Sequence, residues 1–312
     1  MSDDLDIRQD VPLAPLCSLE LGGPARYLVT AHDEQTVANA LRWAKTRQIP
    51  TAFVGGGTNL VVSDAGFDGL VVLMRQQGTR ITGENGRALL TAMAGQSWDT
   101  VVEQAVAEGL AGIECLSGIP GSAGATVVQN VGAYGQEVAD TVKTVRVLDR
   151  RALNFREVPA SACGFSYRES AFKRDPGAAV VLAVTFGLKP GAAAALRYAE
   201  LGKTLGKSAT PHPARVREAV LALRREKSML LRAEDENRRS AGSFFLNPVL
   251  DRARAEQVVR RAVKIGAADR AQEVPRWSAG TGRAKLAAAW LIERSGFSRG
   301  HSAGRVGISS RH

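Results

Sequence analysis

The sequence predicts an α+β protein with two domains. The chain has 312 residues, which is enough for two domains with separate hydrophobic cores. Short β-rich apolar runs alternate with amphipathic helical patterns in the first part of the chain, whereas longer arginine-rich helical patterns follow in the second. We therefore expect a first, two-lobed domain over residues 1–189 and an α+β domain over residues 190–312.

The first domain is expected to begin with a helix and several strands. In residues 33–45, apolar side chains recur at helical spacing and form one stripe. Ser97 can cap a second helix, which starts at Trp98 and ends near Gly109. The predicted strands are Thr51–Val54, Leu60–Val62, Leu70–Leu73, Ala88–Met93, Val142–Leu148 and Val180–Phe186.

The second domain is expected to contain three helices. A stretch with Pro190 and Gly191, Leu188–Ala195, is the predicted linker before it. Helical patterning follows at Arg215–Arg225, Ala253–Lys264 and Arg283–Arg294.

Composition excludes several classes of protein. No apolar run reaches the roughly 18 residues of a membrane helix, so we expect no membrane insertion. The acidic first ten residues do not resemble a signal peptide. The cysteines, Cys17, Cys115 and Cys163, are far apart and odd in number, which argues against a disulfide framework or a zinc site and favours the cytoplasm. The histidines have no metal-binding spacing, so we expect no metal.

The formal net charge of +10 is compatible with nucleic acid or with a small anionic substrate as the partner. Much of the positive charge lies between Arg215 and Lys264, where it alternates with Glu and Asp on helical stretches. This pattern is typical of a solvated helix face. No nucleic-acid-binding motif accompanies it, so we expect no nucleic-acid partner.

Two glycine-rich loops are the clearest functional signal. Glycine lets backbone N–H groups approach a phosphate closely. The first loop, Gly55–Asn59, follows a strand but precedes an apolar run and not a helix, which favours a strand–loop–strand cradle over a Rossmann site. A simple glycine-rich hairpin explains this loop equally well. The second loop, Gly118–Gly124, also lacks the signals of a following helix. Two such loops in one domain favour an interpretation in which they enclose one anionic cofactor.

Motifs along nearly the whole chain resemble those of the UDP-N-acetylenolpyruvoylglucosamine reductase family. The two loops alone resemble only the wider vanillyl-alcohol-oxidase-like FAD fold. Gly22–Ala25 and Gly118–Gly135 also match the family, and the later motifs that narrow the resemblance are Tyr167–Ser170, Gly242–Pro248 and Lys285–Glu293.

The resemblance implies a cytoplasmic, monomeric flavoenzyme of bacterial peptidoglycan synthesis. It would use NADPH to reduce FAD, and would then reduce UDP-N-acetylglucosamine enolpyruvate to UDP-N-acetylmuramate. The residues implied to bind FAD are Gly55, Gly56, Gly57, Thr58 and Asn59 of the first loop, and Gly118, Ile119, Pro120, Gly121, Ser122 and Gly124 of the second.

By the same resemblance, Arg168 stabilises the enolate and Ser243 donates the proton. A guanidinium can hold a carboxylate with two hydrogen bonds. The alternative for Arg168 is an ion pair with Glu169 or Asp175, and that for Ser243 is a turn or helix cap. Phe244 and Phe245 would cover the site or belong to the core. The resemblance also assigns substrate binding to Tyr134, Tyr167, Tyr198, Lys227 and Asn247.

The sequence departs from the family pattern at its C-terminal end. A glutamate that is the family's third catalytic residue has no counterpart before His312, and Glu273 precedes the Lys285–Glu293 motif and so lies in the wrong order. We therefore expect an incomplete second domain, FAD binding, and an impaired enolate step. Two alternatives stay open, namely an FAD oxidase of the wider superfamily and a non-catalytic protein that binds FAD or a UDP-sugar.

Overall fold

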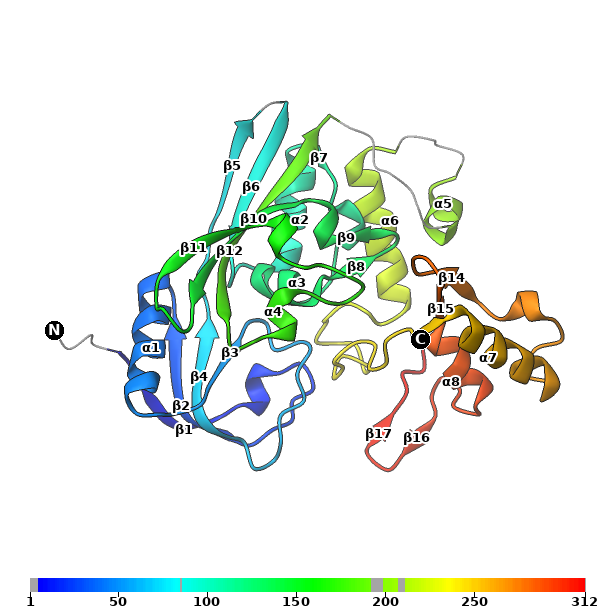
Figure 1. Cartoon of the computed structure of the whole chain (residues 1–312), viewed down its shortest axis with the longest axis horizontal. Coiled ribbons are helices and arrows are strands. Elements are labelled where there is room, and N and C mark those ends of the chain that lie inside the picture. The colour runs from blue at the N-terminus through cyan, green and yellow to red at the C-terminus, as the bar shows by residue number, and fades with distance from the viewer. Residues whose placement is uncertain (1–4, 85, 192–198, 207–210, 312) are drawn as a thin grey trace. The chain divides into compact units, whose positions relative to one another are not determined.

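The computed structural model describes residues 5–84, 86–191, 199–206 and 211–311. The chain forms two compact units, Met1–Ala241 and Gly242–His312 (Figure 1). The expected boundary between residues 189 and 190 falls inside the first unit, because α6 (Pro213–Glu226) packs on α2 (Trp98–Ala107). The assignment of cofactor and substrate roles to residues 1–189 and 190–312 stays a prediction.

The first unit contains a mixed four-stranded sheet in the order β1-β2-β4-β3. Strands β2, β3 and β4 are parallel, and β1 is an antiparallel edge strand. Helix α1 (Glu34–Thr46) starts at Asp33, whose carboxylate caps it by accepting from the Thr36 N–H group. The strands are β1 (Arg8–Pro12), β2 (Pro24–Ala31), β3 (Thr51–Val54) and β4 (Phe67–Met74).

A second, antiparallel sheet of the first unit has the order β11-β10-β12-β6-β5, and β7 pairs with the end of β12. Its strands are β5 (Thr79–Glu84), β6 (Arg87–Met93), β7 (Leu110–Ala111), β10 (Val142–Asp149), β11 (Phe155–Pro159) and β12 (Ala179–Pro190). The remaining helices and the β8–β9 hairpin of the unit are α3 (Ala123–Gln129), α4 (Ala171–Arg174), α5 (Ala199–Leu205), β8 (Gly132–Ala133) and β9 (Gln136–Glu137). Its 3-10 turns are η1 (Ala14–Leu16), η2 (Glu114–Leu116), η3 (Val138–Asp140) and η4 (Ala160–Ala162).

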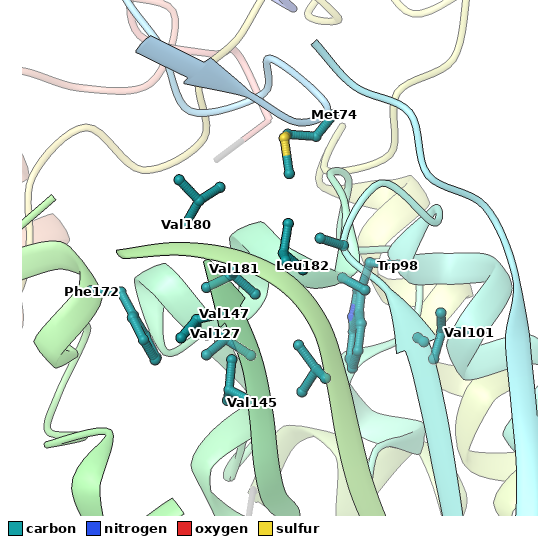
Figure 2. Packing of buried hydrophobic residues seen from close by; sticks show 14 of the residues in the cluster. Met74, Trp98, Val101, Val127, Val145, Val147, Phe172, Val180, Val181 and Leu182 are labelled. Carbon is teal, nitrogen blue, oxygen red and sulfur yellow. The ribbon is translucent and has the colours of Figure 1, made fainter. Parts of the chain in front are cut away.

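The main hydrophobic core lies within this unit and includes residues of both sheets. Figure 2 shows Val145, Val147 and Val181 of the second sheet beside Val127 of α3 and Trp98 of α2. The indole N–H group of Trp98 donates to the Leu116 carbonyl at 3.1 Å, so the largest buried side chain is hydrogen-bonded as well as packed. This core fixes the start of both α2 and α3.

The second unit is a small α+β structure with its own core around Val259 and Val274. Its sheet has the order β13-β15-β14, and both pairings are antiparallel. The elements are β13 (Val249–Asp251), α7 (Arg252–Lys264), η5 (Ala271–Glu273), β14 (Arg276–Ser278), β15 (Arg283–Leu286), α8 (Ala288–Arg294), β16 (Ser302–Ala303) and β17 (Val306–Gly307). None of the helices in the described ranges is long and apolar enough to cross a membrane.

Three of the expected elements are wrong or partly wrong. Leu60–Val62 is not a strand. These residues belong to the loop that leads to β4, where Leu60 and Val62 pack on a small core and a side chain at Gly22 would meet Val62. The expected helix at Arg283–Arg294 begins as strand β15 and becomes helical only at Ala288. The predicted linker starts inside β12, and residues 192–195 of it lie outside the described residues.

Candidate cofactor and substrate site

The two glycine loops lie against each other in the first unit. A Cβ atom added to Gly56 would come within 2.7 Å of the Gly121 Cα atom. The Thr58 hydroxyl donates to the Pro120 carbonyl at 3.3 Å, which ties the loops together. Glycine is therefore required at position 56 for the two backbones to touch, and the predicted pair of facing loops is present.

Each loop is also anchored from outside. The Gly57 carbonyl accepts from the Ser18 N–H group at 3.0 Å, and Gly57 has a φ of +66°, a conformation that favours glycine. In the second loop, the Gly118 N–H group donates to the Asp99 carboxylate at 2.6 Å. Arg217 holds the same carboxylate with bonds of 2.6 and 3.0 Å. Asp99 and Arg217 carry no motif, so the sequence did not indicate this support.

Several backbone donors of the facing loops have no hydrogen-bond partner in the part of the chain that the structure describes. Among the described residues, no hydrogen bond is made by the N–H groups of Gly56, Gly57, Thr58, Gly121 and Ser122. Gly57 and Ser122 are buried, and buried N–H groups normally find an acceptor. A pyrophosphate offers only acceptors, so this arrangement of donors fits the cofactor that the sequence predicted.

The second loop leads into a helix, which corrects our expectation that both loops lack one. Helix α3 begins at Ala123, whose N–H group donates to the Gln96 carbonyl, and ends at Asn130 in a left-handed conformation. Its seven residues span about 10 Å at 1.5 Å per residue. This helix connects the second glycine loop to Asn130 and Gly132, whose carbonyls accept hydrogen bonds from Arg168.

Arg168 lies at the tip of a tight turn. Ser166 and Glu169 exchange two backbone hydrogen bonds of 3.1 and 3.0 Å, and Arg168 itself has a φ of +55°. Its guanidinium donates to the carbonyls of Asn130, at 3.3 Å, and of Gly132. Within the described ranges it makes no ion pair, so the alternative pairing with Glu169 or Asp175 is not formed.

Asn130 organises the surroundings of this arginine. Its side-chain amide donates to the Glu137 carboxylate at 3.0 Å and to the Ser166 carbonyl at 2.8 Å, and its carbonyl oxygen Oδ1 accepts from the Ala139 N–H group at 3.1 Å. Asn130, Tyr134 and Arg168 all have positive φ angles, between 45° and 55°. Such conformations are costly for residues other than glycine and cluster at functional sites.

A buried cation lies beside the second glycine loop. Arg224 of α6 is 8% exposed and donates to the Met229 carbonyl at 2.7 Å, while its Nε atom has no partner. Burial lowers the pKa of Arg224, although the nearby Tyr134 and Asp99 raise it. A guanidinium stays protonated even so. This residue adds positive charge next to Gly118 and was not singled out in the sequence.

The remaining predicted residues are distributed over both units. Lys227 ends α6 and pairs with Glu200 at 2.7 Å, while Tyr134 packs against the small core of α5 and α6. Tyr198 lies outside the described residues. In the second unit, Asn247 accepts from the Ala288 N–H group at 2.9 Å, and Ser243 is exposed in a loop and caps no helix.

Phe244 and Phe245 do not belong to a core, because their side chains are 74% and 64% exposed. That they cover the bound substrate stays a prediction. The three cysteines are buried free thiols, and no cluster of metal-binding side chains occurs among the residues that the structure describes.

Facing glycine loops with free backbone donors, the first of them directly after a parallel strand, indicate a flavoprotein of the FAD-binding class. The FAD binding domain family matches residues 25–152, and the C-terminal domain of UDP-N-acetylenolpyruvoylglucosamine reductase matches residues 234–312. The chain is 48% identical to the reductase of that name from Saccharopolyspora erythraea, over 96% of this chain and 83% of the relative. It is 46% identical to the one from Streptomyces coelicolor, over 97% and 79%.

The chain belongs to the UDP-N-acetylenolpyruvoylglucosamine reductase family. The crystal structure of UDP-N-acetylenolpyruvylglucosamine reductase from Thermus caldophilus has the same fold, with a TM-score of 0.62 and 23% identity over 99% of this chain and 85% of the other. FAD is the cofactor of this family and NADPH its reductant, so both predicted ligands are supported.

Proposed function

We propose that this chain reduces UDP-N-acetylglucosamine enolpyruvate to UDP-N-acetylmuramate, with NADPH as reductant and FAD as cofactor. The observation that carries the proposal is the pair of facing glycine loops with unpartnered N–H groups, joined by α3 to the turn of Arg168. Bound FAD would supply a hydride acceptor that becomes a hydride donor. The loop residues from Gly55 to Asn59 and from Gly118 to Gly124 would hold its pyrophosphate.

Arg168 is proposed to stabilise the negative charge that develops on the substrate. Hydride addition to the vinyl carbon leaves an enolate conjugated with a carboxylate, and a guanidinium aimed at that carboxylate binds the transition state more tightly than the substrate. The carbonyls of Asn130 and Gly132 hold the guanidinium in place before the substrate arrives. This preorganisation supports a catalytic role over a purely structural one.

Ser243 is proposed to give the proton to the adjacent carbon. A serine hydroxyl is a weak acid, but an enolate is basic enough to take its proton. Ser243 is exposed and makes no cap, so its hydroxyl is available. Tyr134, Tyr167, Tyr198, Lys227 and Asn247 are proposed to bind the substrate. Glu200 already neutralises Lys227, so binding of a diphosphate there would require the ammonium to share its three protons.

We further propose that the chain acts as a monomer in the cytoplasm and binds no nucleic acid. The three free thiols support a reducing compartment. The basic α7 also carries Glu256, which pairs with Arg252 at 3.3 Å, and this supports a solvated helix face and not a phosphate-binding one.

The test is a spectroscopic titration of the purified chain under anaerobic conditions. We expect a yellow protein whose flavin absorbance is bleached by NADPH and restored by UDP-N-acetylglucosamine enolpyruvate. Absence of a flavin spectrum would overturn the proposal. Bleaching with rapid recovery in air, but no response to the enolpyruvyl substrate, would favour an oxidase instead.

A further inference from the structure

Gln76 lies at the sheet edge where the first glycine loop starts. Strands β3 and β4 are parallel with Val54 opposite Leu73, so the residues that follow them, from Gly55 and from Arg75, leave the sheet at the same edge. Ligands of parallel sheets bind outside the carboxyl ends of the strands. The Arg75 guanidinium donates to the Gly55 carbonyl at 2.7 Å, which fixes the first loop directly beside this segment.

The other side of Gln76 contacts the turn that carries the second loop. A Cβ atom at Gly95 would come within 2.6 Å of the Gln76 backbone nitrogen. The residues on either side of Gly95 bind the second loop, because the Gly124 N–H group donates to the Ala94 carbonyl at 3.0 Å and Ala123 donates to Gln96 at 2.9 Å. Gln76 is therefore held between the supports of the two loops.

The side chain of Gln76 is fully buried, and neither of its polar atoms has a partner. Its exposed fraction is 0%, and both Nε2 and Oε1 are without a hydrogen bond among the described residues. A buried carboxamide whose donor and acceptor are both unpaired destabilises the folded chain, because it has lost its hydrogen bonds to water without replacing them. The neighbouring Gln77 is different, since it is exposed and donates to the Gly95 carbonyl at 2.9 Å.

We propose that the Gln76 carboxamide is a cofactor-binding group that hydrogen-bonds FAD as donor and acceptor at once. This inference rests on the proposed function. A pyrophosphate only accepts, so it would leave Oε1 unpaired. The adenine edge and the pyrimidine edge of the isoalloxazine each offer a donor beside an acceptor, and either satisfies both atoms of the amide. Gln76 thus selects one heterocyclic edge of FAD in the cofactor site beside the two glycine loops.

The experiment compares Gln76→Met with Gln77→Met in the full chain. Methionine keeps the length of the side chain and removes the amide. FAD affinity is measured by titrating apoprotein and following the quenching of flavin fluorescence, and the melting temperature is measured with and without FAD. Gln76→Leu is the second variant, so that poor folding of one substitution does not decide the outcome.

We expect Gln76→Met to weaken FAD binding about tenfold or more while the apoprotein melts at the wild-type temperature or above it, because an unpaired buried amide has been removed. Gln77→Met should leave FAD affinity unchanged. The inference is overturned if Gln76→Met lowers the melting temperature of the apoprotein and leaves FAD affinity unchanged, since the amide would then serve the protein or a structural water. A wild-type chain that binds no FAD at all would instead refute the proposed function.

Titration with FMN and with ADP distinguishes the two edges. If Gln76 binds the isoalloxazine, the substitution weakens FMN binding by the same factor as FAD binding and leaves ADP binding unchanged. If it binds adenine, the reverse holds. Equal wild-type affinity of the variant for all three ligands would contradict both assignments.

Discussion

Arg168 combines a conformation that arginine rarely adopts with hydrogen bonds that fix its guanidinium. Its φ of +55° places it at the end of a tight turn, and Lys173 donates to its carbonyl at 2.8 Å. Strain of this kind persists only where the surrounding contacts determine the conformation. The motif around Arg168 was recognisable in the sequence. Its conformation and its contacts with Asn130 and Gly132 were not, because they depend on residues about 36 positions away.

We predict that Arg168→Lys separates cofactor binding from catalysis. A lysine ammonium keeps the charge but loses the fork of donors, so it cannot hold both carbonyls and still present two parallel donors to a carboxylate. FAD content should stay at the wild-type level. The rate at which the enolpyruvyl substrate reoxidises the reduced flavin should fall about 100-fold, as measured by anaerobic stopped flow. Arg174→Lys is the matched control, because the Arg174 guanidinium donates to the nearby Gly164 carbonyl at 3.1 Å and has no proposed role in the site. Equal rates for the two variants would contradict the prediction.

Asp99 should make the stability of the first unit depend on pH. Burial raises the pKa of this carboxyl, but hydrogen bonds from Arg217 and from the Gly118 N–H group outweigh burial, and the folded-state pKa lies below its ordinary value. Stabilisation by such a group is present above the unfolded pKa of about 4 and is lost as the pH falls through the folded pKa.

Asp99→Asn should therefore melt about 2–4 °C below the wild type at pH 7, which corresponds to about 1 kcal/mol after allowance for partial exposure. The difference should shrink as the pH falls below about 4. Thermal melts over this pH range provide the measurement. Glu103→Gln is the control, since Glu103 is 67% exposed and lies 3.7 Å from Arg217. A gap between Asp99→Asn and the wild type that is the same at pH 7 and pH 3 would show that the charge of Asp99 is not responsible.

Elements in which apolar residues repeat regularly along a long segment were predictable from the sequence. Elements that depend on partners far away in the sequence were not. α1, α2, α6 and α7 lie within a few residues of their predicted bounds. The run Leu60–Val62 has only three apolar residues, and its packing partner is the Gly22 turn, which local periodicity does not reveal. The pattern of Arg283–Leu286 predicts a helix, but this segment lies between β13 and β14. Its backbone hydrogen bonds to both strands override its helical propensity.

The contact between the two glycine loops predicts how substitutions in them behave. Gly56→Ala places a methyl group 2.7 Å from the Gly121 backbone, which only a separation of the loops can relieve. We expect a loss of about 1–3 kcal/mol in the stability of the first unit and a drop of about tenfold or more in FAD affinity. Flavin absorbance of the purified protein and fluorescence titration measure the second effect. Gly83→Ala is the control, because nothing lies within 4 Å of a side chain there. Similar FAD affinities for the two variants would argue against a cofactor site between the loops.

At the scale of the whole molecule, the groups proposed for FAD and for the protonation step belong to different compact units. The glycine loops and Arg168 lie in Met1–Ala241, whereas Ser243 follows the boundary by two residues. Each unit has its own core. The sequence predicts a change of function at residue 190 from the stretch with Pro190 and Gly191, and this stays a prediction, while helix α6 packs with the first unit. Composition predicts whether a segment forms a helix or a strand, whereas its contacts determine the compact unit to which it belongs.

We predict that brief chymotrypsin treatment of the native chain cuts first after Phe244 or Phe245 and leaves FAD on the N-terminal fragment. Both side chains are exposed, and both lie in a loop just after the boundary, where few contacts oppose local opening. All the groups proposed to hold FAD remain on that fragment. The cut chain should therefore keep its flavin spectrum and its bleaching by NADPH. Reoxidation by the enolpyruvyl substrate should be lost, because Ser243 then lies at a free chain end and Asn247 is cut away with the second unit. Gel filtration with detection of flavin absorbance, and mass spectrometry of the fragments, provide the measurement. A variant with Phe244→Ala and Phe245→Ala should resist this cut. Release of FAD on cleavage at this loop would mean that the second unit also holds the cofactor.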